Sequence, residues 1–184
     1  PNPWRGTNLF QEACWAWRRV PVPVVAAVHG HCYGGGLQIA LAADLRFTTA
    51  DAQWSVLEAK WGLVPDMSGI QALSQQVRMD VAKRLTMTGE VVSGERAVDL
   101  GLASEVHADP VAAATAFIEQ VATRSPDAVA ATKRLFGRTW SSSDRRTFAR
   151  ERIEQAKLLA TKNTTIAREA AMKRAVPAFD PRRR

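Results

Sequence analysis

Two carboxylates are the residues of this 184-residue chain best placed to move protons. Glu58 and Asp66 lie eight positions apart in an irregular stretch, close in sequence to Trp54, Trp61 and Leu63. A carboxyl group among apolar side chains can be tuned to give and take a proton near neutral pH. The pair is therefore a candidate for acid–base chemistry. The structural alternative is an ion pair with a basic residue such as Lys60 for Glu58, and for Asp66 a helix cap near Ser68.

Three consecutive glycines, residues 34–36, stand directly before an apolar run. The N–H of the middle one, Gly35, would lie at the start of a predicted helix, where it suits negative charge that develops on a carbonyl oxygen. The turn lacks the G-x-G-x-x-G layout and the Lys-Ser/Thr pair of phosphate loops, so nucleotide binding is not indicated. Plain turn geometry is the alternative. Gln38 is a polar residue inside the same apolar helix.

The histidines and cysteines do not indicate a metal or a redox centre. His29 and His31 flank a glycine, but no carboxylate is spaced to complete a metal site, and we expect no metal. Cys14 and Cys32 form neither a metal-ligand spacing nor a disulfide framework. We expect small buried side chains at both positions and a reducing cytoplasm as the compartment.

The elements that must position these residues alternate between strand and helix. A β-branched run before His29 predicts a buried strand, and residues 45–56 predict two short strands around a turn. Helices are predicted over residues 7–19, 35–43, 68–77, 80–88 and 94–100, and a last strand over 102–106. Beyond Asp109 the pattern is helical over 109–123, 125–140, 144–161 and 163–175. The order predicts an α/β fold with a core over 1–108 and a helical region over 109–184.

The formal net charge of +7 is concentrated near the C-terminus. Residues 138–184 contain 13 Lys or Arg against 5 Asp or Glu, whereas the rest of the chain is nearly balanced. Such a region attracts nucleic acid, lipid headgroups or a phosphorylated small molecule, unless it is only a solvated helix face. The longest apolar stretches, residues 20–28 and 37–43, are too short to cross a bilayer.

An ordered set of motifs resembles the crotonase (enoyl-CoA hydratase/isomerase) superfamily over about residues 7–179. The motifs are PVVAAVHGHCYGGGLQIALAADLRF, WSVLEAKWGLVPD and LTMTGEVVSGERAVDLGLASEV, in that order. The resemblance implies a crotonase-like spiral of ββα units with a helical C-terminal oligomerisation region. It also implies trimers or dimers of trimers, acyl-CoA substrates, and no cofactor beyond the CoA of the substrate. The family's second oxyanion donor and most of its adenine contacts would lie before Pro1, so we expect a partial chain.

The resemblance also implies roles for the chemical residues. In the family, the middle glycine contributes an oxyanion-hole N–H for the thioester carbonyl, which corresponds to Gly35. Hydratases of the family use two glutamates; the second corresponds to Glu58, but the first falls on Gln38, whose amide does not exchange protons at neutral pH. Glu58 and Asp66, with a Gly-Leu between them, resemble the loop of dienoyl-CoA isomerases. Those enzymes usually have Asp where this chain has Gln38.

Further residues are candidates for substrate binding. An acyl pocket would be lined by residues in or next to the glycine turn and the acidic loop (the irregular stretch 57–69 that contains Glu58 and Asp66), with core packing as the alternative for the aromatic ones. In the family, basic and aromatic residues near the C-terminus approach the CoA of a neighbouring subunit. The candidates are Gly34, Tyr33, Trp54, Trp61, Lys173, Arg174 and Phe179.

These observations predict an acyl-CoA isomerase of fatty-acid metabolism that shifts double bonds in enoyl- or dienoyl-CoA through a stabilised enolate. One alternative is a 2-enoyl-CoA hydratase in which Glu58 acts on a water molecule held by Gln38. A second is a non-catalytic or RNA-binding relative, since the tail is basic. Few aromatic residues are interleaved with the basic ones, which argues against a nucleic-acid platform. We expect no membrane partner.

Overall fold

The computed structural model describes residues 6–182 and divides the chain into two compact units. Of these residues, 6–18 and 24–115 form the first unit, and 19–23 and 116–182 form the second. Within the described residues, no helix combines the length and the apolar composition that crossing a membrane requires.

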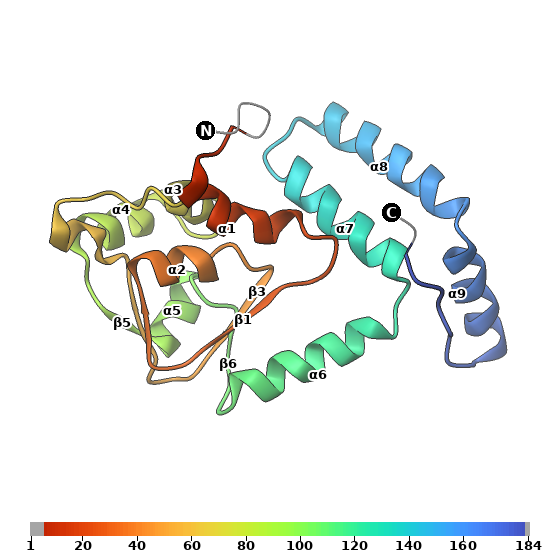
Figure 1. The fold of residues 1–184 in the computed structure, drawn as a ribbon, viewed down its shortest axis with the longest axis horizontal. Coiled ribbons are helices and arrows are strands. Elements are labelled where there is room, and N and C mark those ends of the chain that lie inside the picture. Colours follow the sequence, from red (N-terminus) through yellow and green to blue (C-terminus); the bar gives the residue numbers. More distant parts are fainter. Residues whose placement is uncertain (1–5, 183–184) are drawn as a thin grey trace. The chain divides into compact units, whose positions relative to one another are not determined.

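The first unit alternates short strands and helices, as the sequence predicted (Figure 1). Its elements in chain order are α1 (Leu9–Arg19), β1 (Val25–Val28), β2 (His31–Tyr33), α2 (Gly34–Ala40), β3 (Leu45–Thr48), β4 (Gln53–Ser55), the 3-10 helix η1 (Leu57–Trp61), α3 (Gly69–Ser74), α4 (Met79–Thr88), β5 (Val92–Ser93), α5 (Gly94–Leu100) and β6 (Glu105–Val106). The predicted α/β class is confirmed.

Two small sheets share these strands. One has the order β1-β3-β6 and is parallel throughout, and the other has the order β2-β4-β5, with β2 parallel and β5 antiparallel to β4. Consecutive strands β1 and β2 enter different sheets, and so do β3 and β4, so each winding of the chain adds one strand to each sheet. Because β2 and β4 run in parallel, the segments that follow them leave from the same edge.

An apolar core holds the two sheets and α2 together. Leu37 of α2 and Leu41, the residue that follows this helix, are fully buried together with Trp54 of β4, Leu73 and Leu85. Burial of a side chain of this size contributes about 1.5–3 kcal/mol. The indole N–H of Trp54 is also satisfied, because it donates to Thr48 Oγ1 at 3.0 Å. This packing fixes α2 with respect to β4.

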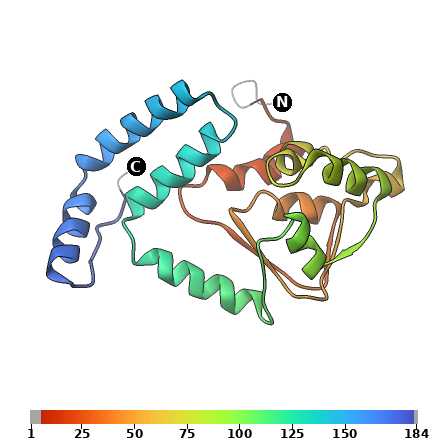
Figure 2. The same cartoon turned by 180° about the vertical axis from the view of Figure 1, so that it is seen from behind.

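The second unit is helical, as the pattern beyond Asp109 predicted (Figure 2). Helix α6 (Pro110–Ala122) leads into it, and α7 (Pro126–Thr139), α8 (Asp144–Leu159) and α9 (Lys162–Lys173) follow. Helix α7 packs against α8, and α9 contacts both. Ser125 caps α7 by accepting from the Ala128 N–H at 3.4 Å, and Pro126 occupies the first turn, where no N–H is needed.

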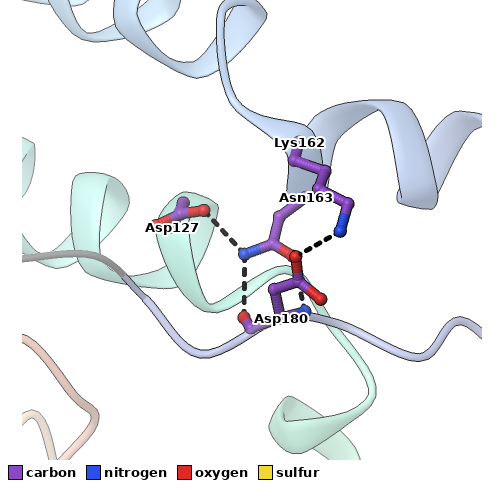
Figure 3. Close-up of polar contacts among 4 residues, drawn as sticks. All are labelled: Asp127, Lys162, Asn163 and Asp180. Atoms are coloured by element: carbon purple, nitrogen blue, oxygen red, sulfur yellow. Dashed lines mark hydrogen bonds and ion pairs between the residues drawn. The ribbon is translucent and has the colours of Figure 1, made fainter.

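A buried asparagine attaches the segment after α9 to this helical unit (Figure 3). Asn163 is 3% exposed, and its Nδ2 donates to Asp127 Oδ2 at 2.8 Å and to the Asp180 carbonyl at 3.0 Å. In return, the Asp180 N–H donates to Asn163 Oδ1 at 2.9 Å. Lys162 adds an exposed ion pair with Asp180 at 2.7 Å. The segment around Asp180 is therefore held by two hydrogen bonds with the Asn163 side chain and by the ion pair with Lys162.

Candidate active site

The glycine turn places an N–H group at the beginning of α2. Strand β2 ends at Tyr33 and α2 begins at the next residue, Gly34, whose φ of +48° is a conformation that favours glycine. Gly35 is the second residue of the helix, so its N–H has no acceptor within the helix. The side chain of Tyr33, the N-cap residue, does not cap it. The helix dipole and this N–H both favour an anionic oxygen at this position.

The carboxylate of Glu58 lies against the same turn. Parallel pairing of β2 with β4 sets Tyr33 opposite Ser55, so α2 and η1 start from the same edge of the sheet. A Cβ atom built on Gly34 would be 3.4 Å from Glu58 Oε1. Glu58 is 8% exposed. The structure thus brings the predicted oxyanion donor and one predicted proton-transfer group to one place.

Gln38 connects this carboxylate to the loop before α3. Its Nε2 donates to Glu58 Oε1 at 2.6 Å, and its Oε1 accepts from the N–H groups of Met67 at 2.8 Å and Gly69 at 3.0 Å. Gln38 is 1% exposed, so these hydrogen bonds form without competition from water. One buried amide therefore fixes both Glu58 and the start of α3.

The second oxygen of Glu58 has no hydrogen-bond partner among the described residues. Glu58 Oε2 is buried and unpaired, although its neighbour Oε1 is held by Gln38. A buried carboxylate oxygen without a donor is costly in a purely structural role. A carboxylate oxygen in this setting can accept a hydrogen bond or a proton from a bound molecule.

The loop before α3 contributes residues that the sequence did not single out. The sulfur of Met67 would lie 3.2 Å from a Cβ built on Gly35, so this side chain faces the glycine turn. Ser68 has a φ of +70°, which is rare for serine, and its hydroxyl is buried without a partner in the part of the chain that the structure describes. Gly69 stands where a Cβ would be 2.6 Å from Gln38 Oε1. In the sequence, the glycine at position 69 is the feature that could have indicated a close approach of the backbone at this point.

Asp66 lies in the same loop but is exposed. The structure gives it no hydrogen bond to a described residue, and it does not cap α3, because the Gly69 N–H donates to Gln38 instead. Glu58 likewise has no ion pair with Lys60 or with any other residue in the described range. Both structural alternatives considered for the two carboxylates are therefore wrong.

The remaining candidates lie in three different settings. The hydroxyl of Tyr33 bonds to Gln53 on the neighbouring strand, and Trp61 is 68% exposed with the Lys60 ammonium 5.6 Å from its ring. Trp54 is 0% exposed and packs in the core, the alternative considered for it. The C-terminal candidates belong to the second unit; Lys173 and Arg174 are exposed and Phe179 is half-buried.

Comparison with known proteins gives this site a chemical context. The sequence model of the enoyl-CoA hydratase/isomerase family matches residues 7–180. Among curated proteins, the chain is 39% identical over 114 residues to (E)-benzylidenesuccinyl-CoA hydratase of Thauera aromatica, a match that covers 60% of this chain and 44% of the relative. It is 33% identical over 130 residues to the mitochondrial Delta(3,5)-Delta(2,4)-dienoyl-CoA isomerase of Mus musculus, covering 68% and 40%. The chain thus spans less than half the length of these relatives.

A solved structure resembles the fold over nearly the whole chain. The enoyl-CoA hydratase from Polaromonas sp. JS666 superposes with a TM-score of 0.87 at 29% identity, covering 93% of this chain and 67% of that one. The spiral arrangement of strands and helices is therefore shared with a solved protein.

Proposed function

Since the chain belongs to the enoyl-CoA hydratase/isomerase family, we propose that its protein is an acyl-CoA isomerase that shifts a double bond in an enoyl- or dienoyl-CoA thioester. In this proposal the thioester carbonyl oxygen accepts a hydrogen bond from the N–H of Gly35. One such donor contributes about 3–4 kcal/mol to stabilising a transition state. The charge that develops on the oxygen makes the neighbouring carbon acidic enough for a carboxylate to deprotonate.

Proton transfer is divided between the two carboxylates. Glu58 Oε2 takes a proton from the carbon chain, and the electron pair of the broken C–H bond is delocalised into the enolate. A proton is then returned at the far end of the conjugated system, and the double bond ends in its new position. We assign removal to Glu58, because it lies beside the glycine turn, and delivery to Asp66, whose carboxyl is exposed. Before the next turnover Glu58 releases the proton that it took up and Asp66 gains one, so the net reaction moves a proton within the substrate.

The observation that carries the proposal is the unpaired oxygen of Glu58 beside the glycine turn. Hydration by two carboxylates needs a second acid at position 38, where this chain has an amide. The oxygen of that amide already accepts two backbone N–H groups and is not available to accept from water. An isomerase needs only that a proton leave at one carbon and arrive at another.

A 2-enoyl-CoA hydratase is the second candidate. The 39% identity to a hydratase favours it, and Gln38 Nε2 carries a second N–H, beyond the one given to Glu58, for which no hydrogen bond is seen among the described residues. In that case Glu58 alone would activate the water.

Two substrates distinguish these candidates. Purified protein is incubated separately with a 3,5-dienoyl-CoA and with crotonyl-CoA, and the products are separated by chromatography. We expect isomerisation of the diene without rapid hydration of crotonyl-CoA. Rapid hydration that depends on Glu58 would contradict the isomerase proposal and support the hydratase.

Two variants test the assigned roles. Glu58→Gln should lower kcat/KM by about 10²–10⁴-fold, and Asp66→Asn should lower kcat with little change in KM. Asp51→Asn, which removes an exposed charge in a turn of the first unit, is the matched control. Normal turnover in both Glu58→Gln and Asp66→Asn would show that the roles are wrong.

We also propose a cytoplasmic homo-oligomer, a trimer or a dimer of trimers. The second unit supports this, because Phe136 on α7 and Trp140 directly after it are 59% and 65% exposed, and Phe148 on α8 is 54% exposed. Lys173, Arg174 and Phe179 would then approach the CoA of a neighbouring subunit. Light scattering gives the mass, and a raised KM for acyl-CoA in Lys173→Ala/Arg174→Ala tests the CoA contact.

A further inference from the structure

The hydrogen bonds of Gln38 allow only one orientation of its amide. Backbone N–H groups can only donate, so the atom that faces Met67 and Gly69 is the amide oxygen. The NH₂ group is therefore the one that faces Glu58 Oε1. Rotation of the amide by 180° would set donors against donors and would leave Glu58 without a partner.

We propose that Gln38 is a positioning residue that confines proton transfer at Glu58 to a single oxygen, Oε2. The inference rests on the proposed function of Glu58. Oε1 is held by a donor that cannot accept a proton in return, so a proton between Gln38 and Glu58 always belongs to the amide. Oε2, which is buried and without a donor, is left as the reactive atom.

The alternative is that Gln38 serves only as a cap for α3. The two roles use different atoms of the same side chain: the oxygen holds the loop and the nitrogen holds Glu58. A Gln38→Glu variant distinguishes the two roles. One carboxylate oxygen can still accept from the N–H groups of Met67 and Gly69, but the other oxygen stands where the amide NH₂ donated to Glu58 and cannot donate. Two carboxylate oxygens at this distance cannot both be ionised and must share a proton.

No other charged group in the described surroundings of Glu58 takes over this role. Helix α2 contains no ionisable residue, and the charged residues of α4 are exposed. Lys60 on η1 and Asp66 in the following loop are exposed as well. The charged residues of α4 are Asp80, Lys83 and Arg84. A pH effect in the Gln38→Glu variant is therefore attributable to positions 38 and 58.

The test compares thermal unfolding of wild type and Gln38→Glu between about pH 5 and pH 8. The folded variant binds one proton more than its unfolded chain. The contribution of this proton to the free energy of unfolding is therefore full at low pH and is lost as the pH rises. We expect its Tm to fall progressively below that of wild type, by at least about 3 °C more at the upper end than at the lower end. The kcat/KM of the variant should instead rise with pH, because Glu58 can take up a substrate proton only after the shared proton has left.

Two further variants complete the test. Gln71→Glu makes the same charge change at an exposed position of α3 and should show no such pH dependence. The exchanged pair Gln38→Glu/Glu58→Gln should restore a pH-independent Tm difference, because one donor and one acceptor again face each other, while remaining inactive. A pH-independent Tm difference for Gln38→Glu alone would overturn the proposal. Absence of isomerase activity in the wild type would instead contradict the proposed function, because the unfolding result does not depend on turnover.

Discussion

Gly69 is the residue at which the geometry of the acidic loop leaves least room for change. A Cβ atom there would be 2.6 Å from Gln38 Oε1 and 2.8 Å from Pro65 Cβ. Both neighbours are buried, so the loop would have to move.

We therefore expect Gly69→Ala to lower the free energy of unfolding by about 1–3 kcal/mol, as overpacking of a filled site does. The loop should move away from Gln38, and kcat/KM should fall with it. Urea unfolding measures the first effect. Gly137→Ala is the control, because a Cβ at this position of α7 meets nothing within 4 Å. Replacing a glycine inside a helix by alanine should raise the free energy of unfolding by about 0.5–1 kcal/mol. Equal stabilities of the two variants would contradict the packing at Gly69.

At the residue scale, the sequence identified the participants but not their connections. The resemblance pointed to Gly35 and Glu58, and the structure places the Glu58 carboxylate beside the glycine turn. It did not reveal what Gln38 does, because its backbone partners Met67 and Gly69 are 29 and 31 positions away. A hydrogen bond across such a separation leaves no periodic pattern in the chain.

At the scale of elements, a part-buried ion pair joins α7 to α8. Glu154 is 5% exposed and receives Arg134 Nη2 at 2.5 Å and Nε at 3.1 Å. The hydrogen bonds from Arg134 hold the pKa of Glu154 below its ordinary value, although burial opposes them. The pair therefore stabilises the folded state at neutral pH.

The pH dependence of this pair can be measured. Because the folded pKa is lowered, the stabilisation is present above the ordinary carboxyl pKa and is lost as the pH falls below it. Glu154→Gln should lower the free energy of unfolding by about 1.5–3 kcal/mol at neutral pH, with a smaller difference in acid. Denaturant titrations of both proteins at several pH values measure it. A difference that does not shrink towards low pH would contradict the assigned ion pair.

The attachment of the C-terminal segment gives a second prediction at this scale. Asn163→Asp removes both side-chain N–H donors and sets a carboxylate against Asp127 (Figure 3). We expect faster tryptic cleavage after Arg174, which mass spectrometry measures. Lys162→Ala, which removes only an exposed ion pair, should change the rate little. Equal cleavage of Asn163→Asp and wild type would show that the asparagine does not hold the segment.

The elements themselves were predictable where local chemistry marks their ends. Residues 94–100 were predicted as a helix and form α5 with those bounds, since Ser93 caps its start and Gly101 takes a left-handed conformation at its end. The strands β2 and β5 were not predicted. They contain three and two residues, too few for an alternating pattern, and exist because β4 pairs with both.

On the scale of the whole molecule, the two thiols report on the first unit. Cys14 and Cys32 are free and buried, and burial raises the pKa of Cys32 to about 12 and raises that of Cys14 as well. At about pH 8 both are therefore almost entirely protonated and slow to alkylate.

We expect native protein to react with iodoacetamide far more slowly than protein unfolded in urea, with both cysteines modified only in the unfolded chain. Mass spectrometry after timed quenching measures this. Rapid modification of the native protein would contradict the packing of α1 or β2, and the modified cysteine would identify which.

The alternation of strand and helix patterns was enough to predict the α/β class, and the helical pattern beyond Asp109 was enough to predict the helical C-terminal region, because each element carries its own local periodicity. The pairing of strands into two separate sheets could not be predicted in the same way. It depends on which edges meet after folding, and short strands carry little information about their partners.

The amide bridge from Gln38 to residues 67 and 69 has a consequence for protein engineering. An acidic loop transplanted from a relative into this scaffold would arrive with backbone amides shaped for that relative's own residue at the corresponding helix position. Catalytic specificity in this fold is therefore best exchanged as a two-segment cassette, with the helix residue and the loop transferred together.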